Sequence, residues 1–159
     1  MTNSTHPRNP GISLNLDWLD SVQMNRSALE RRCITLTKCR SIKKEWQAAW
    51  LLKSLRCMDL TTLSSDDTPD RVRRLCAKAR QPLRPDLIES LGLKALKPRV
   101  GAVCVYHAYV ETAVDALKKT GIPVAAVSTG FPHGLNSMPL RVEEIKDSVA
   151  AGAEEIDIV

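Results

Sequence analysis

From residue 57 onward, the hydrophobic positions alternate between two patterns along the chain. Short strand-like runs of apolar residues occupy residues 57–63, 100–106, 123–129 and 155–159. Stretches between them repeat their apolar residues every three or four positions, which is typical of a helix with one buried face. Strands that alternate with helices predict parallel strands joined by helical crossovers. The pattern therefore predicts an α/β fold.

Start and stop signals mark the helices between these runs. Thr68 is placed to cap the first helix, with Pro69 at the first helical position, where a missing N–H costs nothing. Gly121 ends the second helix, and Pro139 opens the third. The inward-facing stripes are predicted at Val72, Leu75, Cys76 and Ala79, at Val110, Ala113, Val114 and Leu117, and at Val142, Ile145 and Val149.

The first third of the chain has a different pattern. A capping box from Ser27 to Glu30 predicts the start of one helix, and Ser41 is placed to cap a second. Trp46 and Trp50 lie one turn apart on that second helix, which predicts that they anchor it to a larger body. The predicted organisation is a flexible lead-in over residues 1–24, a helical extension over 25–56 and β/α units over 57–159.

The spacing of the strands favours a barrel over a dinucleotide-binding fold. A β/α barrel uses about 31 residues per unit, or about 250 residues over eight units, and the strand starts are compatible with this spacing. The loop after the first strand contains no G-x-G-x-x-G, which argues against a dinucleotide site. The alternation and the spacing are therefore compatible with units of a TIM (β/α)8 barrel that follow a helical extension.

Two aspartates stand at inward-facing strand positions, which is unusual for this residue. Asp59 and Asp157 alternate with apolar neighbours on the first and fourth strands. A buried carboxylate costs several kcal/mol unless it is paired, so the two together favour a polar cavity. The alternative is that each carboxylate satisfies a backbone N–H or a lysine. Cys104 on the second strand faces the same side, where a plain core thiol is the competing interpretation.

Composition and charge narrow the class of protein. The 159 residues are 43% hydrophobic and 26% charged, values that exclude fibrous and wholly disordered proteins. Residues 1–80 carry 15 Lys and Arg against 8 Asp and Glu, whereas the remaining residues carry 8 against 10. A basic RNA-binding module and a helical extension with solvated basic faces both fit this asymmetry. Because no nucleic-acid-binding motif accompanies the charge, we do not expect a nucleic acid partner.

Other sequence signals concern compartment and metal. Five cysteines, an odd number, contain no C-x-x-C spacing and predict reduced thiols. The three histidines lie far apart and predict no metal site. No apolar run approaches the roughly 18 residues of a membrane span, and the first 12 residues lack the apolar core of a signal peptide. We therefore expect a cytoplasmic protein with no membrane partner.

Several motifs together resemble deoxyribose-phosphate aldolase. They are CMDLTTLSSDDT, AVCVY, STGFPHG and EIDIV, and KKEWQAAWLLK is similar to the helical extension of the animal form. The resemblance implies an eight-stranded β/α barrel. It also implies reversible cleavage of 2-deoxyribose 5-phosphate to acetaldehyde and glyceraldehyde 3-phosphate through a lysine Schiff base, without metal or cofactor. The implied partners are small sugar phosphate and aldehyde substrates, and a homo-oligomer is compatible with the family.

The resemblance also implies roles for individual residues. Asp157 matches the aspartate that serves the proton relay, whereas the matches to substrate-pocket positions are Asp59, Thr61, Leu63 and Cys104. His107 stands where the family usually has Pro, which predicts a local difference in the following loop and leaves a role in proton transfer open.

The family's Schiff-base lysine has no counterpart in this chain. In the family that lysine and its partner lysine lie on strands six and seven, and every lysine here falls outside the predicted strands. We expect the 159-residue chain alone to be inactive and to represent an incomplete sequence. The alternative is a natural short isoform that acts as a non-catalytic binding or interfering module.

Overall fold

The computed structural model describes residue 13, residues 15–39 and residues 42–159. It divides into two compact units, Met1–Ser41 and Ile42–Val159. The first unit contains the short helix α1 (Asp17–Asp20) and the longer helix α2 (Arg26–Lys38). No residue of either helix is buried, so the apolar side chains of α2 have no partner within the described part of this unit.

The start of α2 differs from the predicted capping box. Asn25 is the N-cap residue, and its Oδ1 accepts a hydrogen bond from the Ala28 N–H at 3.0 Å. Ser27 lies inside the helix. The prediction was wrong because Asn caps a helix as well as Ser does, and Asn25 allows the helix to begin one residue after it. The predicted cap at Ser41 lies outside the described residues.

The second unit begins with α3 (Lys44–Leu55) and continues into a parallel sheet. Trp46 and Trp50 on α3 are 69% and 57% exposed, so the expected anchoring role is not seen. Leu55, at the end of the helix, packs against the core instead. The contact is made there because the chain enters the sheet directly after α3.

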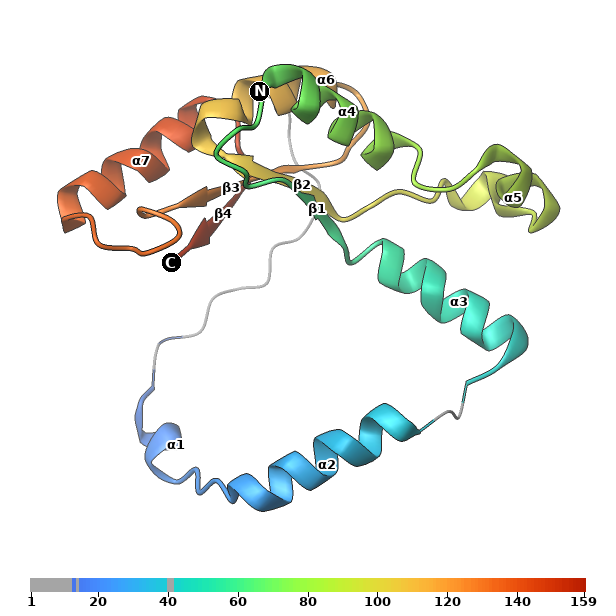
Figure 1. Ribbon diagram of the computed structural model, residues 1–159, viewed down its shortest axis with the longest axis horizontal. Helices are drawn as coiled ribbons and strands as arrows, with labels where there is room; N and C mark the ends of the chain where they lie inside the picture. Colours follow the sequence, from blue (N-terminus) through green and yellow to red (C-terminus); the bar gives the residue numbers. More distant parts are fainter. Residues whose placement is uncertain (1–12, 14, 40–41) are drawn as a thin grey trace. The chain divides into compact units, whose positions relative to one another are not determined.

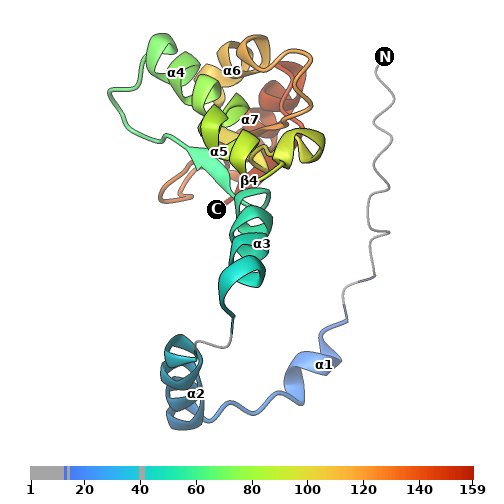
Figure 2. The ribbon, with the colours of Figure 1, turned by 90° about the vertical axis from the view of Figure 1, so that its right-hand side faces the viewer.

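The sheet has four parallel strands in the order β1-β2-β3-β4. They are β1 (Asp59–Thr61), β2 (Ala102–Tyr106), β3 (Val124–Ser128) and β4 (Glu155–Ile158). The connections contain α4 (Pro69–Arg80), α5 (Pro85–Ser90), η1 (Leu93–Leu96), η2 (His107–Tyr109), α6 (Val110–Ala116) and α7 (Met138–Ala150). Figures 1 and 2 show α4, α6 and α7 on one side of the sheet, which we call the helix-covered face.

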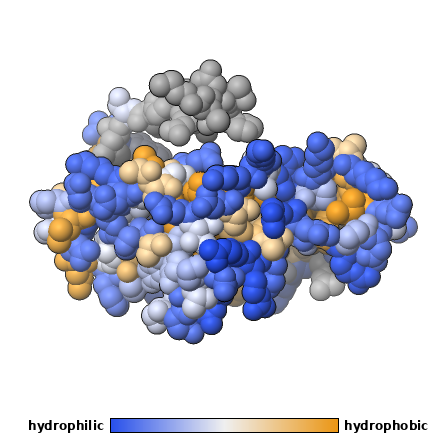
Figure 3. Space-filling view, turned by 90° about the horizontal axis from the view of Figure 1, so that it is seen from above, coloured by the Kyte–Doolittle hydropathy of each residue, from blue (hydrophilic) through white to orange (hydrophobic). Residues whose placement is uncertain are grey.

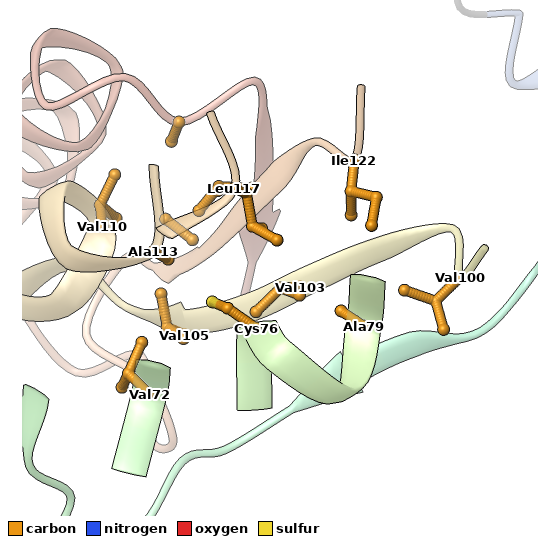
Figure 4. Close-up of a cluster of buried hydrophobic side chains, with 13 residues drawn as sticks. Val72, Cys76, Ala79, Val100, Val103, Val105, Val110, Ala113, Leu117 and Ile122 are labelled. Atoms are coloured by element: carbon orange, nitrogen blue, oxygen red, sulfur yellow. The ribbon is translucent and has the colours of Figure 1, made fainter. Parts of the chain in front are cut away.

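The core lies between this face and its helices. Figure 4 shows Val72 and Cys76 of α4 pointing toward Val103 and Val105 of β2, with Val110 of α6 closing the cluster. All five side chains are fully buried. Thr68 caps α4 by accepting a hydrogen bond from the Arg71 N–H, as predicted. The predicted stripe of α4 is therefore confirmed.

Helix α7 differs from its predicted orientation. Val142 and Val149 are 42% and 54% exposed, whereas Ser148 is 1% exposed. The Ser148 hydroxyl donates to the Glu144 carbonyl at 2.9 Å, so its burial leaves no unsatisfied donor. Both valines therefore lie on the outer surface. The space-filling view from above shows a mostly hydrophilic surface with hydrophobic patches (Figure 3).

Candidate active site

The face of the sheet opposite the helices carries the predicted site residues. Leu60 and Ile156 pack against the core on the helix-covered face, so their strand neighbours point the other way. Cys104 is 2% exposed and forms a second small cluster with Ala125 and Val127. We call this the open face, because within the described residues no helix of the crossovers covers it. These contacts agree with the predicted alternation of β1 and β2 and with the predicted orientation of Ile156 and Asp157 on β4.

A hollow of about 340 Å³ lies on the open face near the carboxyl ends of the strands. Four predicted site residues line it: Thr61, Leu63, Cys104 and Asp157. Four further residues line it that the sequence did not single out: Val127, Phe131, Ile158 and Val159. The hollow therefore brings together residues from all four strands and from the segments that follow β1, β3 and β4.

Cys104 and Asp157 are the two chemically reactive groups in the hollow. The Cys104 Sγ donates a hydrogen bond to Asp157 Oδ2 at 3.5 Å. Burial, together with the negative charge of Asp157, raises the pKa of the Cys104 thiol to about 12. Cys104 is therefore a neutral thiol at physiological pH, and Asp157 is the one carboxylate that lines the hollow.

Asp59 does not line this hollow. It lies at the first position of β1, opposite Ala102, and its side chain is exposed. A Cβ atom at Gly101 would come within 3.1 Å of Asp59 Oδ1, so a glycine there leaves room for the carboxylate. Asp59 and Asp157 thus lie on the same open face, but only Asp157 lines the hollow. The sequence led us to expect both carboxylates in one cavity, and the structure places one of them there.

A third carboxylate on this face, Glu155, was missed by the sequence prediction. It lies two residues before Asp157 on β4, and alternation therefore puts both side chains on the same face. Burial raises the pKa of Glu155, and the negative charges of Asp59 and Asp157 raise it further. The i, i+2 spacing to Asp157 was the signal that could have identified it.

The loop after β1 is held in place by a buried carboxylate. Asp67 accepts hydrogen bonds from the Thr62 hydroxyl at 2.9 Å and the Ser64 N–H at 3.0 Å. Its carboxylate also lies 3.4 Å from Arg71 Nη1, and its side chain is fully buried. Because Thr62 and Ser64 flank Leu63, these bonds fix the backbone from which Leu63 reaches the hollow.

No lysine lines the hollow. None of the four strands contains one, and every lysine of the chain is an exposed residue: Lys38, Lys43, Lys44, Lys53, Lys78, Lys94, Lys97, Lys118, Lys119 and Lys146. His107 also stands apart from it, at the start of η2, with Nδ1 3.6 Å from Glu144 Oε1. The hollow therefore contains a carboxylate but no amine nucleophile.

Within the part of the chain that the structure describes, no group of three or more His, Cys, Asp or Glu side chains is arranged to hold a metal ion. No helix of that part is long and apolar enough to cross a membrane.

The chain is similar to curated proteins named deoxyribose-phosphate aldolase. It is 51% identical to the mouse (Mus musculus) protein and 49% identical to the bovine (Bos taurus) protein, over 151 residues and 94% of this chain in both cases. It is 48% identical to the human (Homo sapiens) protein over 153 residues. No family model matches the chain.

The chain belongs to the deoxyribose-phosphate aldolase family. It spans about half the length of these curated relatives and corresponds to their N-terminal half. This confirms the family that the sequence motifs indicated.

Solved structures of deoxyribose-phosphate aldolases share the fold. A Coccidioides immitis protein assigned to this family superposes with a TM-score of 0.55 and 26% identity, over 92% of this chain and 48% of that one. The tetrameric aldolase of Aeropyrum pernix gives a TM-score of 0.52 over 67% of this chain and 38% of that one, and at 21% identity it shows the fold alone. The predicted fold class, the first four units of a TIM (β/α)8 barrel, is thereby confirmed.

Proposed function

We propose that this chain provides the acid–base side of a deoxyribose-phosphate aldolase site. The reaction is the reversible cleavage of 2-deoxy-D-ribose 5-phosphate to D-glyceraldehyde 3-phosphate and acetaldehyde through a lysine Schiff base, without a metal or cofactor. The observation that carries the proposal is the placement of Asp157 in a hollow at the carboxyl ends of parallel strands, where β/α-barrel enzymes build their sites.

In this proposal Asp157 is the catalytic residue and relays a proton during formation and hydrolysis of the imine. Its partners in the hollow have simpler roles. Thr61 and Leu63 shape the substrate pocket, and Cys104 contributes a neutral thiol that donates a hydrogen bond to the carboxylate. Asp59, which the family match places at a substrate-pocket position, lies on the same face outside the hollow.

The 159-residue chain alone is proposed to lack aldolase activity. An amine forms an imine at neutral pH when desolvation or a neighbouring cation lowers its pKa, and the exposed lysines of this chain have neither the placement nor the burial for that. The lysine belongs to another part of the barrel in the family. We also propose that the substrates are a sugar phosphate and an aldehyde, and that the protein is a cytoplasmic homo-oligomer. We further propose that the chain divides at residues 24/25 and 56/57.

Borohydride trapping tests this function. The chain is incubated with 2-deoxyribose 5-phosphate and sodium borohydride and then analysed by mass spectrometry, with the full-length mouse relative as the positive control. We expect an adduct on the mouse protein and none on this chain. A covalent adduct on any lysine of this chain would contradict the proposed division of the site.

A second candidate is the non-catalytic interfering module. It is favoured by the two outer strands, since β1 and β4 each pair with only one strand within the described residues. An open parallel edge is a template for pairing with another chain. Co-expression with a full-length relative separates the candidates, because an interfering module lowers the relative's activity in proportion to its own abundance.

A further inference from the structure

One wall of the hollow is formed by the loop that joins β3 to α7. Phe131 in this loop lines the hollow and packs edge-on against Tyr106, with the ring centroids 5.9 Å apart and the planes at 64°. Both rings also lie against the small cluster around Cys104. Phe131 therefore forms part of the wall of the hollow.

Glu144 on α7 holds the first limb of this loop. Its Oε2 accepts a hydrogen bond from the Gly130 N–H at 2.9 Å, and its side chain is only 18% exposed. Gly130 has φ +81°, and a Cβ atom there would meet the Asn136 side chain at 2.9 Å. The turn at Gly130 therefore depends on a glycine and on an anionic acceptor from α7.

Arg141, one turn earlier on α7, holds the second limb. Its Nε donates to the Asn136 carbonyl at 2.8 Å, and its Nη2 donates to the Gly134 carbonyl. The two limbs are also joined to each other, because the Gly134 N–H donates to the Gly130 carbonyl at 2.8 Å. A guanidinium with several donors in fixed geometry suits two carbonyls at once.

We propose that Glu144 and Arg141 are positioning residues that hold Phe131 as a wall of the substrate pocket. Neither side chain lines the hollow, so both act through the loop backbone. The proposal rests on the proposed function only in naming the hollow as the substrate pocket. The same bonds turn Arg141, Glu144 and Ser148 toward the sheet, which explains why Val142 and Val149 of α7 are exposed.

Two other contacts reach this loop. Thr129, directly before Gly130, accepts a hydrogen bond from the Val159 N–H at 2.8 Å through its Oγ1. His107 Nδ1 lies 3.6 Å from the other carboxylate oxygen of Glu144. The Val159 side chain also lies against Gly134, where a Cβ atom would meet it at 3.3 Å. The side-chain hydrogen bonds to the far limb come from Arg141, so we assign the placement of the Phe131 tip to the two α7 residues.

Fluorine NMR tests the proposal, because Phe131 is the single phenylalanine of the chain. Incorporation of 4-fluorophenylalanine gives one resonance, which reports on the wall directly and needs no substrate. In Glu144→Ala we expect this resonance to move toward the value of the unfolded chain and to broaden. Glu144→Gln retains an acceptor oxygen and is expected to restore the wild-type signal. Glu143→Ala is the matched control, since Glu143 is exposed and pairs only with Lys146 on the surface.

Alkylation of Cys104 provides a second readout. We expect iodoacetamide to modify Cys104 about tenfold faster in Glu144→Ala, the change that loss of a hydrogen bond to a charged group produces in local opening. Arg141→Lys keeps the charge but can donate to only one of the two carbonyls. It is therefore the alternative test variant if Glu144→Ala does not fold. A folded Glu144→Ala or Arg141→Lys with the wild-type resonance and rate would overturn the proposal, as would a Glu143→Ala effect of equal size. Because neither readout involves imine formation, failure of the borohydride experiment would leave this result unaffected.

Discussion

The two faces of the same sheet differ in how completely they are covered. On the helix-covered face Val103 and Val105 are fully buried, and the outer strands contribute the partly buried Leu60 and Ile156. On the open face the central strands are also buried, as parallel sheets require. The outer strands, however, expose three carboxylates there: Asp59, Glu155 and Asp157.

Because of this difference, neighbouring residues of one strand contribute to different properties, one to folding stability and the next to the candidate site. A residue and its neighbour on β4 belong to opposite faces, so Ile156 contributes to packing whereas Asp157 contributes to the hollow. Substitutions on the helix-covered face should therefore change the free energy of unfolding, and those on the open face should change reactivity and pH dependence. The predictions below test this division.

The largest expected effect concerns the reactivity of Cys104. Its pKa of about 12 means that the thiolate is about a thousandfold scarcer than for an ordinary thiol, since each pKa unit is a factor of ten. We expect iodoacetamide to label the exposed Cys57 quickly at pH 8, and Cys104 to react only as the pH rises far above 9. Folding stability should also fall over that alkaline range, because the unfolded chain ionises this thiol more easily.

Peptide mapping of alkylated protein at several pH values measures this rate. Asp157→Asn removes the nearby negative charge and should raise the rate of Cys104 labelling at a given pH. Equal rates for Cys104 and Cys57 in the folded chain would show that the open face does not control the thiol.

A core substitution gives the largest expected effect on stability. Val105→Ala removes two fully buried methyl groups and should lower the free energy of unfolding by about 2 to 3 kcal/mol. Asp157→Asn on the open face should change it by less than about 0.5 kcal/mol. Urea unfolding followed by circular dichroism compares the two variants. A larger loss of unfolding free energy for Asp157→Asn than for Val105→Ala would contradict the assignment of stability to the helix-covered face.

Loss of the α4 cap should have a smaller effect. Thr68→Ala removes the acceptor of the Arg71 N–H and should cost about 1 kcal/mol, because that N–H then lacks its side-chain partner. Thr68→Ser keeps the hydroxyl and should remain close to the wild type. Thermal or urea unfolding of both variants measures the cost. An unchanged unfolding midpoint for Thr68→Ala would show that the Thr68 cap does not stabilise α4.

The smallest effect concerns the pH dependence contributed by Glu155. Burial and neighbouring carboxylates raise the pKa of Glu155, so the folded chain binds this proton more tightly than the unfolded chain. The destabilisation that the charged form causes is therefore relieved as the pH falls through the raised pKa. Glu155→Gln should flatten the stability profile in that acidic range, whereas an unchanged profile would indicate that Glu155 is well solvated.

The sequence was informative where one local rule acts alone. The period of two correctly predicted that Leu60 and Asp59 lie on opposite faces of β1. Thr68 and Pro69 correctly located the start of α4. At the start of α2 two residues of equal capping strength competed, and the structure uses Asn25 rather than Ser27.

The sequence failed where long-range bonds decide the outcome. The predicted stripe of α7 differs from the structure, in which Ser148 is buried and Glu144 bonds to Gly130, 14 residues earlier. Phe131 reaches the hollow from an irregular loop, where no periodicity applies.

Complementation with the C-terminal half of a relative tests the central claim most directly. The chain is mixed with the separately produced C-terminal half of the mouse relative, complex formation is checked by size-exclusion chromatography, and cleavage of 2-deoxyribose 5-phosphate is measured. We expect an active complex, an imine adduct confined to the mouse half, and at least about a hundredfold loss of activity in Asp157→Asn, as for removal of a general acid–base group. A complex that forms without activity, or one in which Asp157→Asn is as active as the wild type, would contradict the account.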